Sequence, residues 1–344
     1  MGTMKTMFKD LWTDLEASAS HKAGPGTARR LVGLDAICPM FIGVKAPAML
    51  RTFILEVPRD SAPLPDIIPV SRGLHFTVQI TGDEILPGHA SLMLSSSAVA
   101  YNEIFASIAE DLYSKLHSLT KRKEVIAGFL TRVRLWQVFF EKQGDDGLSE
   151  EAQRGLYGEL RLLKDHVFPS AASLEKAVLA WTGPRSRQHD FQFGSAAVEV
   201  KTSASKQHQK LQITSEQQLD ETTVGALYLY YLSVALIEGG AETLPALIDD
   251  IRVTLSLKSG ALSEFDNLLI EAGYVDSHRA KYDPTGYSVR ESAVFLVEND
   301  FPRIRESDIR LGIGDVKYSI SVAQCRSHEV PFSELSVKIG EACR

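Results

Sequence analysis

The stretch that decides the fold is HDFQFGSAAVEVKTS, residues 189–203. Apolar side chains alternate on both sides of the pair Gly194-Ser195, a pattern typical of two antiparallel strands joined by a two-residue turn. Glycine at the first turn position favours a type II′ turn. The turn fixes the register, in which Phe191 faces Val198 on the apolar side of the hairpin. We therefore predict a hairpin with one face in the core.

The other face of this hairpin carries three charges. The register places Asp190 opposite Glu199, with Lys201 on the same side, and directly opposed like charges destabilise a sheet. A divalent cation held by Asp190, Glu199 and the carbonyl oxygen of Val200 would relieve the repulsion, and Mg²⁺ prefers such oxygen ligands. Lys201, kept protonated by the acids, would position a water molecule and stabilise phosphoryl charge. The alternative is a solvated face on which Lys201 partly neutralises the pair.

A helix upstream supplies a third acid. Residues 149–168 read SEEAQRGLYGELRLLKDHVF and place apolar residues at helical spacing. Glu159 lies at the margin of this stripe, so it is either a structural carboxylate or a third acid of the same site. Gly155 and Gly158 each weaken a helix by about 1 kcal/mol relative to alanine, which suggests close packing on a sheet. The stripe consists of Ala152, Leu156, Leu160, Leu163 and Val167.

Composition narrows the protein class only slightly. A net charge of −7 argues against a generic cationic coat for DNA but allows a local positive groove. The three cysteines are far apart and predict neither a zinc site nor a disulfide framework. The longest apolar stretch, 226–237, is too short for a membrane span, which needs about 20 residues. We therefore expect a cytoplasmic protein without a membrane partner.

Periodicity along the 344 residues suggests four regions. We predict a β-rich N-terminal domain (1–102), a helical connector (103–147), a mixed core (148–238) and a C-terminal α/β extension packed on that core (239–344). In the first region the expected strands are 51–57, 75–81 and 90–96. In the core we expect a helix at 149–167, a strand at 176–182, the hairpin, a short helix at 214–221 and a strand at 225–236. In the extension we expect helices at 243–256 and 261–272 and strands at 287–298 and 310–323.

The order of acids and elements resembles the catalytic core of the PD-(D/E)XK nuclease superfamily. In this resemblance Glu159 corresponds to the helix acid, Asp190 to the strand aspartate, and Glu199 with Lys201 to the Glu-x-Lys motif; His189 replaces the eponymous proline. The likeness covers residues 149–236 and implies an α/β chain, α+β overall, with a restriction-endonuclease-like αβββαβ core. Including YGELRLL and DFPRIR, the whole chain resembles uncharacterised PD-(D/E)XK proteins of prokaryotic defence-gene clusters.

The resemblance implies Mg²⁺-dependent hydrolysis of DNA phosphodiester bonds, with Mn²⁺ able to substitute, in a restriction or phage-defence system. DNA contacts would come from basic residues that flank the acids, namely Arg185, Arg187, Lys206 and Lys210. Because no Walker sequence is present, a separate ATPase or methyltransferase subunit is a candidate partner, and an oligomer is compatible with the sequence.

Two other function classes stay open at this point. The chain could be a non-catalytic DNA-binding or assembly subunit that retains the nuclease fold. It could also be a small-molecule phosphoesterase or a glycosidase that uses paired carboxylates. A glycosidase fits less well, because its carboxyl groups lie at least about 5–5.5 Å apart and hairpin-opposed acids are closer. Lys201 also suits phosphate better than sugar.

Overall fold

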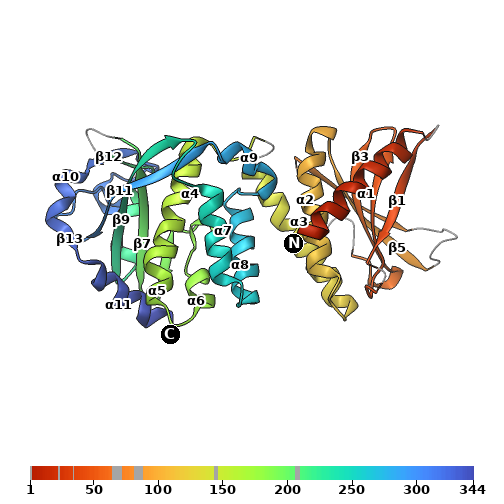
Figure 1. Ribbon diagram of the computed structural model, residues 1–344. Coiled ribbons are helices and arrows are strands. Elements are labelled where there is room, and N and C mark those ends of the chain that lie inside the picture. The colour runs from red at the N-terminus through yellow and green to blue at the C-terminus, as the bar shows by residue number, and fades with distance from the viewer. Residues whose placement is uncertain are drawn as a thin grey trace. The chain divides into compact units, whose positions relative to one another are not determined.

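A computed structural model describes residues 2–21, 24–33, 35–63, 72–80, 88–142, 146–205 and 210–344. The chain forms two compact units (Figure 1). The first comprises Met1–Gly147 with Val275–Ser277, and the second comprises Leu148–Tyr274 with His278–Arg344. In the described residues no helix is both long and apolar enough to cross a membrane.

The first unit contains a five-stranded antiparallel sheet in the order β1-β2-β3-β5-β4. The three strands expected from alternation are present as β3, β4 and β5. A helix that the sequence pattern did not indicate, α1, buries Phe8 and Trp12. The bounds are α1 (Gly2–Ser20), β1 (Gly26–Val32), β2 (Met40–Ala46), β3 (Leu50–Pro58), β4 (Leu74–Ile80) and β5 (His89–Ser96).

The predicted helical connector belongs to this first unit. Its two helices, α2 (Asn102–Leu116) and α3 (Arg122–Lys142), bury their apolar faces within the unit. Phe129 of α3 stacks on Phe53 of the sheet, with 6.3 Å between ring centroids. Helices α2 and α3 therefore lie in the same compact unit as this sheet, where their apolar faces are buried.

The second unit has a mixed sheet in the order β10-β11-β9-β7-β6, with β13 paired to β11. Strands β7 and β9 are parallel, and the other strand pairs of this sheet in the described residues are antiparallel. A separate two-stranded sheet pairs β8 with β12. The bounds are β6 (Phe191–Phe193), β7 (Ala196–Ser203), β8 (Lys210–Ile213), β9 (Ala226–Glu238), β10 (Glu242–Thr243), β11 (Thr285–Leu296), β12 (Tyr318–Ser321) and β13 (Glu329–Val330).

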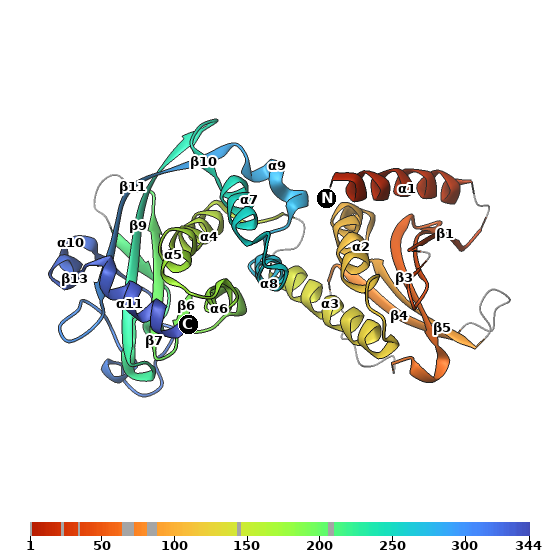
Figure 2. The same ribbon diagram turned by 60° about the horizontal axis from the view of Figure 1, so that its bottom comes forward.

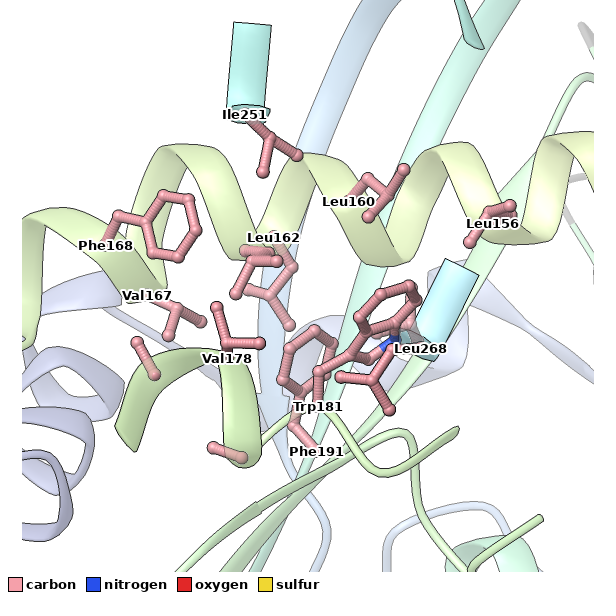
Figure 3. Packing of buried hydrophobic residues seen from close by; sticks show 14 of the residues in the cluster. Leu156, Leu160, Leu162, Val167, Phe168, Val178, Trp181, Phe191, Ile251 and Leu268 are labelled. Atoms are coloured by element: carbon pink, nitrogen blue, oxygen red, sulfur yellow. The ribbon is translucent and has the colours of Figure 1, made fainter. Parts of the chain in front are cut away.

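Helices cover one face of the mixed sheet (Figure 2). Leu160, Ile251 and Leu268 come from three different helices and belong to one buried cluster with Trp181 and Phe191 (Figure 3). The other face packs against β8 and the C-terminal segments through a second apolar cluster. Helix α4 (Glu150–Leu162) continues as a π-helical turn (Leu163–Val167) and as α5 (Phe168–Ser170). The other helices of the unit, on either face of the sheet, are α6 (Leu174–Leu179), α7 (Leu244–Leu255), α8 (Ser259–Glu271), α9 (Arg279–Tyr282), α10 (Val322–Cys325) and α11 (Phe332–Ala342).

The expected strand at 176–182 is wrong, because this segment forms helix α6. Ser173 begins the helix by accepting a hydrogen bond from the Lys176 N–H at 3.2 Å, and the Ala180 N–H bonds to the Lys176 carbonyl at 3.0 Å. A short apolar run fits a buried strand or a buried helix equally well, and here the serine cap decides.

The rest of the predicted αβββαβ order also differs in detail. The short helix expected at 214–221 consists of two 3₁₀ turns, Glu216–Leu219 and Glu221–Thr223. The strand expected at 310–323 is reduced to β12. Strand β8 pairs with β12 outside the main sheet. The unit is a mixed α/β fold in which α4 precedes α6, β6, β7, β8 and β9.

Candidate active site

The candidate site lies where β6 stops covering β7. Pairing of the two strands runs from Phe193–Ala196 to Phe191–Val198, in the predicted register. The predicted pair Asp190–Glu199 is not part of this ladder, because the Asp190 carbonyl accepts from the N–H groups of Thr182 and Gly183 instead. Gly194 has φ 59°, as a type II′ turn requires at its first position. Past Val198 the edge of β7 has no partner in β6. There the side chain of Asp190 replaces the strand partner, because its Oδ2 accepts a hydrogen bond from the Val200 N–H at 2.8 Å.

The two faces of β7 present different kinds of side chain near this edge. Val198 and Val200 point into the core beneath the helices, whereas Ala197 packs in the cluster on the β8 side. Because alternate residues share a face, Glu199 and Lys201 lie on the β8 side. Helix α4 lies on the opposite side of the sheet, so its acid must reach the edge from the other face.

Gly158 allows helix α4 to approach the sheet. A Cβ at this position would lie 1.8 Å from Thr202 Oγ1 and 3.4 Å from Val200 Cγ1. The predicted packing role is therefore confirmed for Gly158. For Gly155 it is wrong: a Cβ there would meet no atom within 4 Å.

Glu159 reaches the site beside Asp190. Its Oε2 accepts a hydrogen bond from Trp181 Nε1 at 2.7 Å. Gly183 permits the approach, because a Cβ there would lie 2.9 Å from Glu159 Oε2 and 2.8 Å from Asp190 Oδ1. The N–H groups of Thr182 and Gly183 both donate to the Asp190 carbonyl, which fixes the aspartate backbone. Sequence reasoning missed Gly183, and its only local signal was the Gly-Pro pair at 183–184.

Lys201 is held by one acid and one amide. Its Nζ lies 2.8 Å from Glu199 Oε1 and donates to Gln218 Oε1 at 3.0 Å. The same amide oxygen accepts from the Thr214 N–H at 2.9 Å. Ser215 caps the following 3₁₀ turn by accepting from the Gln217 N–H, and Gln218 turns toward the lysine. Sequence spacing gave no signal for this contact.

All four predicted catalytic residues line one cavity of about 440 Å³. Glu159, Asp190, Glu199 and Lys201 share it with Val200, with residues of α4 and with residues of β8. The side chain of Glu199 is only 3% exposed and that of Lys201 is 16% exposed. The remaining lining residues are Glu151, Arg154, Gly155, Thr202, Ser203, Ala204, Ser205, Lys210, Leu211, Gln212, Thr214 and Gln218.

Burial changes the protonation of these groups. Burial, and then the charge of Asp190, raise the pKa of Glu199 to about 8, against the opposing effect of Lys201. Burial also raises the pKa of Glu159, with a further contribution from Asp190. The pKa of Asp190 is raised by burial in spite of its hydrogen bond from Val200. Burial alone would lower the pKa of Lys201, but Glu199 and the other acids raise it, so Lys201 stays an ammonium.

The donor set fits a hard divalent cation. The charge of Asp190 raises the cost of ionising Glu199, and a nearby cation would offset that cost. Val200 lies between two residues of the site, and strand alternation turns its carbonyl toward the same uncovered edge as its N–H. No group of three acid, histidine or cysteine side chains in the described segments converges to hold a metal ion. Two carboxylates, one carbonyl and waters are the donors that remain for Mg²⁺, which commonly retains waters.

The four predicted DNA-binding residues are placed differently. Lys210 lines the cavity, whereas Arg185 is ion-paired with Glu264 and with Glu271, the latter at 3.2 Å. Arg187 is exposed and does not line the cavity. Lys206 lies outside the described residues. Their roles in DNA binding stay predictions.

Comparison with known families agrees with the resemblance. The model of the DUF4420 family, described as "Putative PD-(D/E)XK family member", matches residues 8–323. No curated protein and no solved structure matches the chain. The family match spans both compact units and includes every residue of the candidate site. The chain therefore belongs to the DUF4420 family of PD-(D/E)XK-type proteins.

Proposed function

We propose that this protein is a metal-dependent endonuclease that hydrolyses DNA phosphodiester bonds. The observation that supports this most is the meeting of Glu159, Asp190, Glu199 and Lys201 in one cavity from a helix, a loop and a strand. Family membership makes nuclease chemistry the first expectation for such a site. DNA as the substrate, and a restriction or phage-defence setting, are proposed from the sequence resemblance.

In this proposal Asp190, Glu199 and the Val200 carbonyl hold Mg²⁺ or Mn²⁺. The bound ion would lower the pKa of a water molecule and offset charge on the scissile phosphate. Lys201, protonated and hydrogen-bonded to Glu199 and Gln218, presents its remaining N–H to the phosphoryl oxygens. Glu159 is fixed by Trp181 and supplies a third acid, whose pKa is raised by burial and by the charge of Asp190.

The test is a titration of Mg²⁺ and Mn²⁺ against supercoiled, linear and single-stranded DNA, with the whole chain. We expect cleavage that needs the metal and stops with excess EDTA. Lys201→Ala is the matched control, because it removes the ammonium and leaves both acids. Cleavage that persists in EDTA, or that is equal in Lys201→Ala, would refute the proposal.

One observation favours a second candidate, a non-catalytic DNA-binding or assembly subunit. Glu199 is almost fully buried and its Oε1 is paired with Lys201, an arrangement that a purely structural ion pair also explains. This candidate predicts that Glu199→Ala leaves the activity of the assembled complex intact. The endonuclease proposal predicts that the same substitution abolishes it.

A further inference from the structure

One basic side chain of the cavity is not ion-paired with an acid among the residues that the structure describes. Arg154 lies on α4, is partly buried and lines the cavity. Within the part of the chain that the structure describes, no ion pair of Arg154 is found. Arg161, two turns later on the same helix, is held by Asp165 at 2.6 Å and by Glu242 at 3.1 Å. Arg154 therefore keeps its donors available on the cavity wall.

Gly155, which follows Arg154 in α4, has no side chain, although a side chain there would meet no atom within 4 Å of its Cβ. Gly155 lies inside α4, where glycine costs about 1 kcal/mol relative to alanine. Unlike Gly158, which must be small because Thr202 lies against it, Gly155 faces open space. Packing does not explain this glycine. Its absent side chain leaves room in the cavity that a ligand can use.

The opposite wall also carries a cation. Strand β8 packs on the other face of the sheet from α4, and its exposed residues Lys210 and Gln212 line the cavity. The cavity therefore has a basic residue on each wall, with Glu159, Asp190 and Glu199 between them and the exposed Glu151 on the same wall as Arg154. An anionic chain that passes between the walls would meet positive charge on both sides of the acids.

We propose that Arg154 and Gly155 form a phosphate-binding subsite next to the scissile phosphate, opposite Lys210. This inference rests on the proposed nuclease function. The nucleic-acid backbone would pass over Gly155, close to the helix, and the planar guanidinium of Arg154 would donate two parallel hydrogen bonds to one phosphate. Contacts of this kind position the strand and carry no base preference.

The experiment measures binding and cleavage separately. Anisotropy of a short fluorescein-labelled oligonucleotide, single-stranded and annealed, is followed in Ca²⁺ at several salt concentrations, and cleavage is followed in Mg²⁺. We expect Arg154→Ala to weaken binding of both DNA forms by about tenfold and to lower the salt slope by about one. Arg154→Lys should recover part of the affinity. Gly155→Leu should weaken binding by occupying the subsite.

Two variants control for charge and for helix glycines. Arg134→Ala removes an exposed charge from α3. Gly260→Leu replaces a glycine of α8 that also faces open space. Both should bind as the wild type does. If Arg154→Ala and Gly155→Leu also bind and cleave as the wild type does, the subsite is refuted and the nuclease proposal stands. If Arg154→Ala loses affinity while the wild type binds but never cleaves, the subsite stands and the nuclease proposal falls. A wild type that binds neither DNA form refutes both.

Discussion

The carboxylate of Asp190 accepts a hydrogen bond from the backbone N–H of Val200 at 2.8 Å, and so occupies an edge of β7 that β6 leaves uncovered. One oxygen of the aspartate is thus structural, while the other lies close to Glu159 beside Gly183. The two tasks can be separated by substitution, because an amide retains the acceptor and loses the charge.

We expect Asp190→Asn to keep the stability of the wild type within about 1 kcal/mol, since its side-chain oxygen can still accept from Val200. Cleavage should fall at least about a hundredfold, because a metal ligand loses its charge. Asp190→Ala should lose cleavage equally and in addition lose about 1–3 kcal/mol of stability through the unpaired N–H. Urea unfolding and a plasmid-cleavage assay measure both effects. Equal stability of the two variants would mean that the hydrogen bond to Val200 contributes nothing.

The two glycines of α4 should respond oppositely to alanine. Gly158→Ala places a Cβ 1.8 Å from Thr202 Oγ1 and should destabilise the protein by about 1–3 kcal/mol. Gly155→Ala meets nothing within 4 Å and should stabilise it by up to about 1 kcal/mol through helix propensity. Thermal unfolding of the pair compares the same chemical change in the same helix. A stabilised Gly158→Ala would show that helix and strand can separate at little cost.

The hairpin was predictable because its information is local. A Gly-Ser turn and a strict alternation fixed the strand register and, with it, the side on which Glu199 and Lys201 lie, whereas Asp190 lies at the strand edge. Glu159 was harder, because its approach depends on Gly158 and Gly183, which contact residues far away in the sequence. The contact of Gln218 with Lys201 could not be predicted for the same reason. No short sequence pattern specifies a hydrogen bond between side chains of two different elements.

Two expected strands differ from the structure. The segment 176–182 reads as a strand from a short apolar run, which does not distinguish a buried helix from a buried strand. Of the segment 310–323, only Tyr318–Ser321 forms a strand, which pairs with β8. Periodicity also does not say on which sheet an amphipathic helix packs, so only the structure places α2 and α3 in the unit of the five-stranded sheet. Tertiary packing decided each of these cases.

Gln218 should act as a positioning residue for Lys201. Gln218→Met keeps the length of the side chain and removes the acceptor, so we expect kcat to fall about tenfold while KM changes little. Gln218→Glu keeps an acceptor oxygen and should retain most of the rate. Steady-state kinetics with both variants checks this. A parallel loss in both variants would indicate that the residue only supports the local fold.

The raised pKa of Glu199 predicts how stability depends on pH in the absence of metal. The folded group titrates near 8 and its ordinary value is 4.5, so between these values the unfolded chain releases a proton that the folded chain retains. The stability that Glu199 contributes is therefore full below about pH 4.5 and is lost as pH rises toward 8. The slope is up to about 1.4 kcal/mol per pH unit for one proton, and Glu159 and Asp190 act in the same direction.

Urea unfolding at a series of pH values in EDTA measures this slope. Glu199→Gln should flatten it by up to one proton, whatever the variant's absolute stability, because the titrating group is gone. Adding Mg²⁺ should stabilise the wild type most at high pH, since binding requires ionised carboxylates. The exposed Glu341, replaced in the same way, provides the control and should leave the slope unchanged. If Glu199→Gln also leaves it unchanged, Glu199 ionises normally in the folded protein, and the acids do not repel one another at this edge of β7.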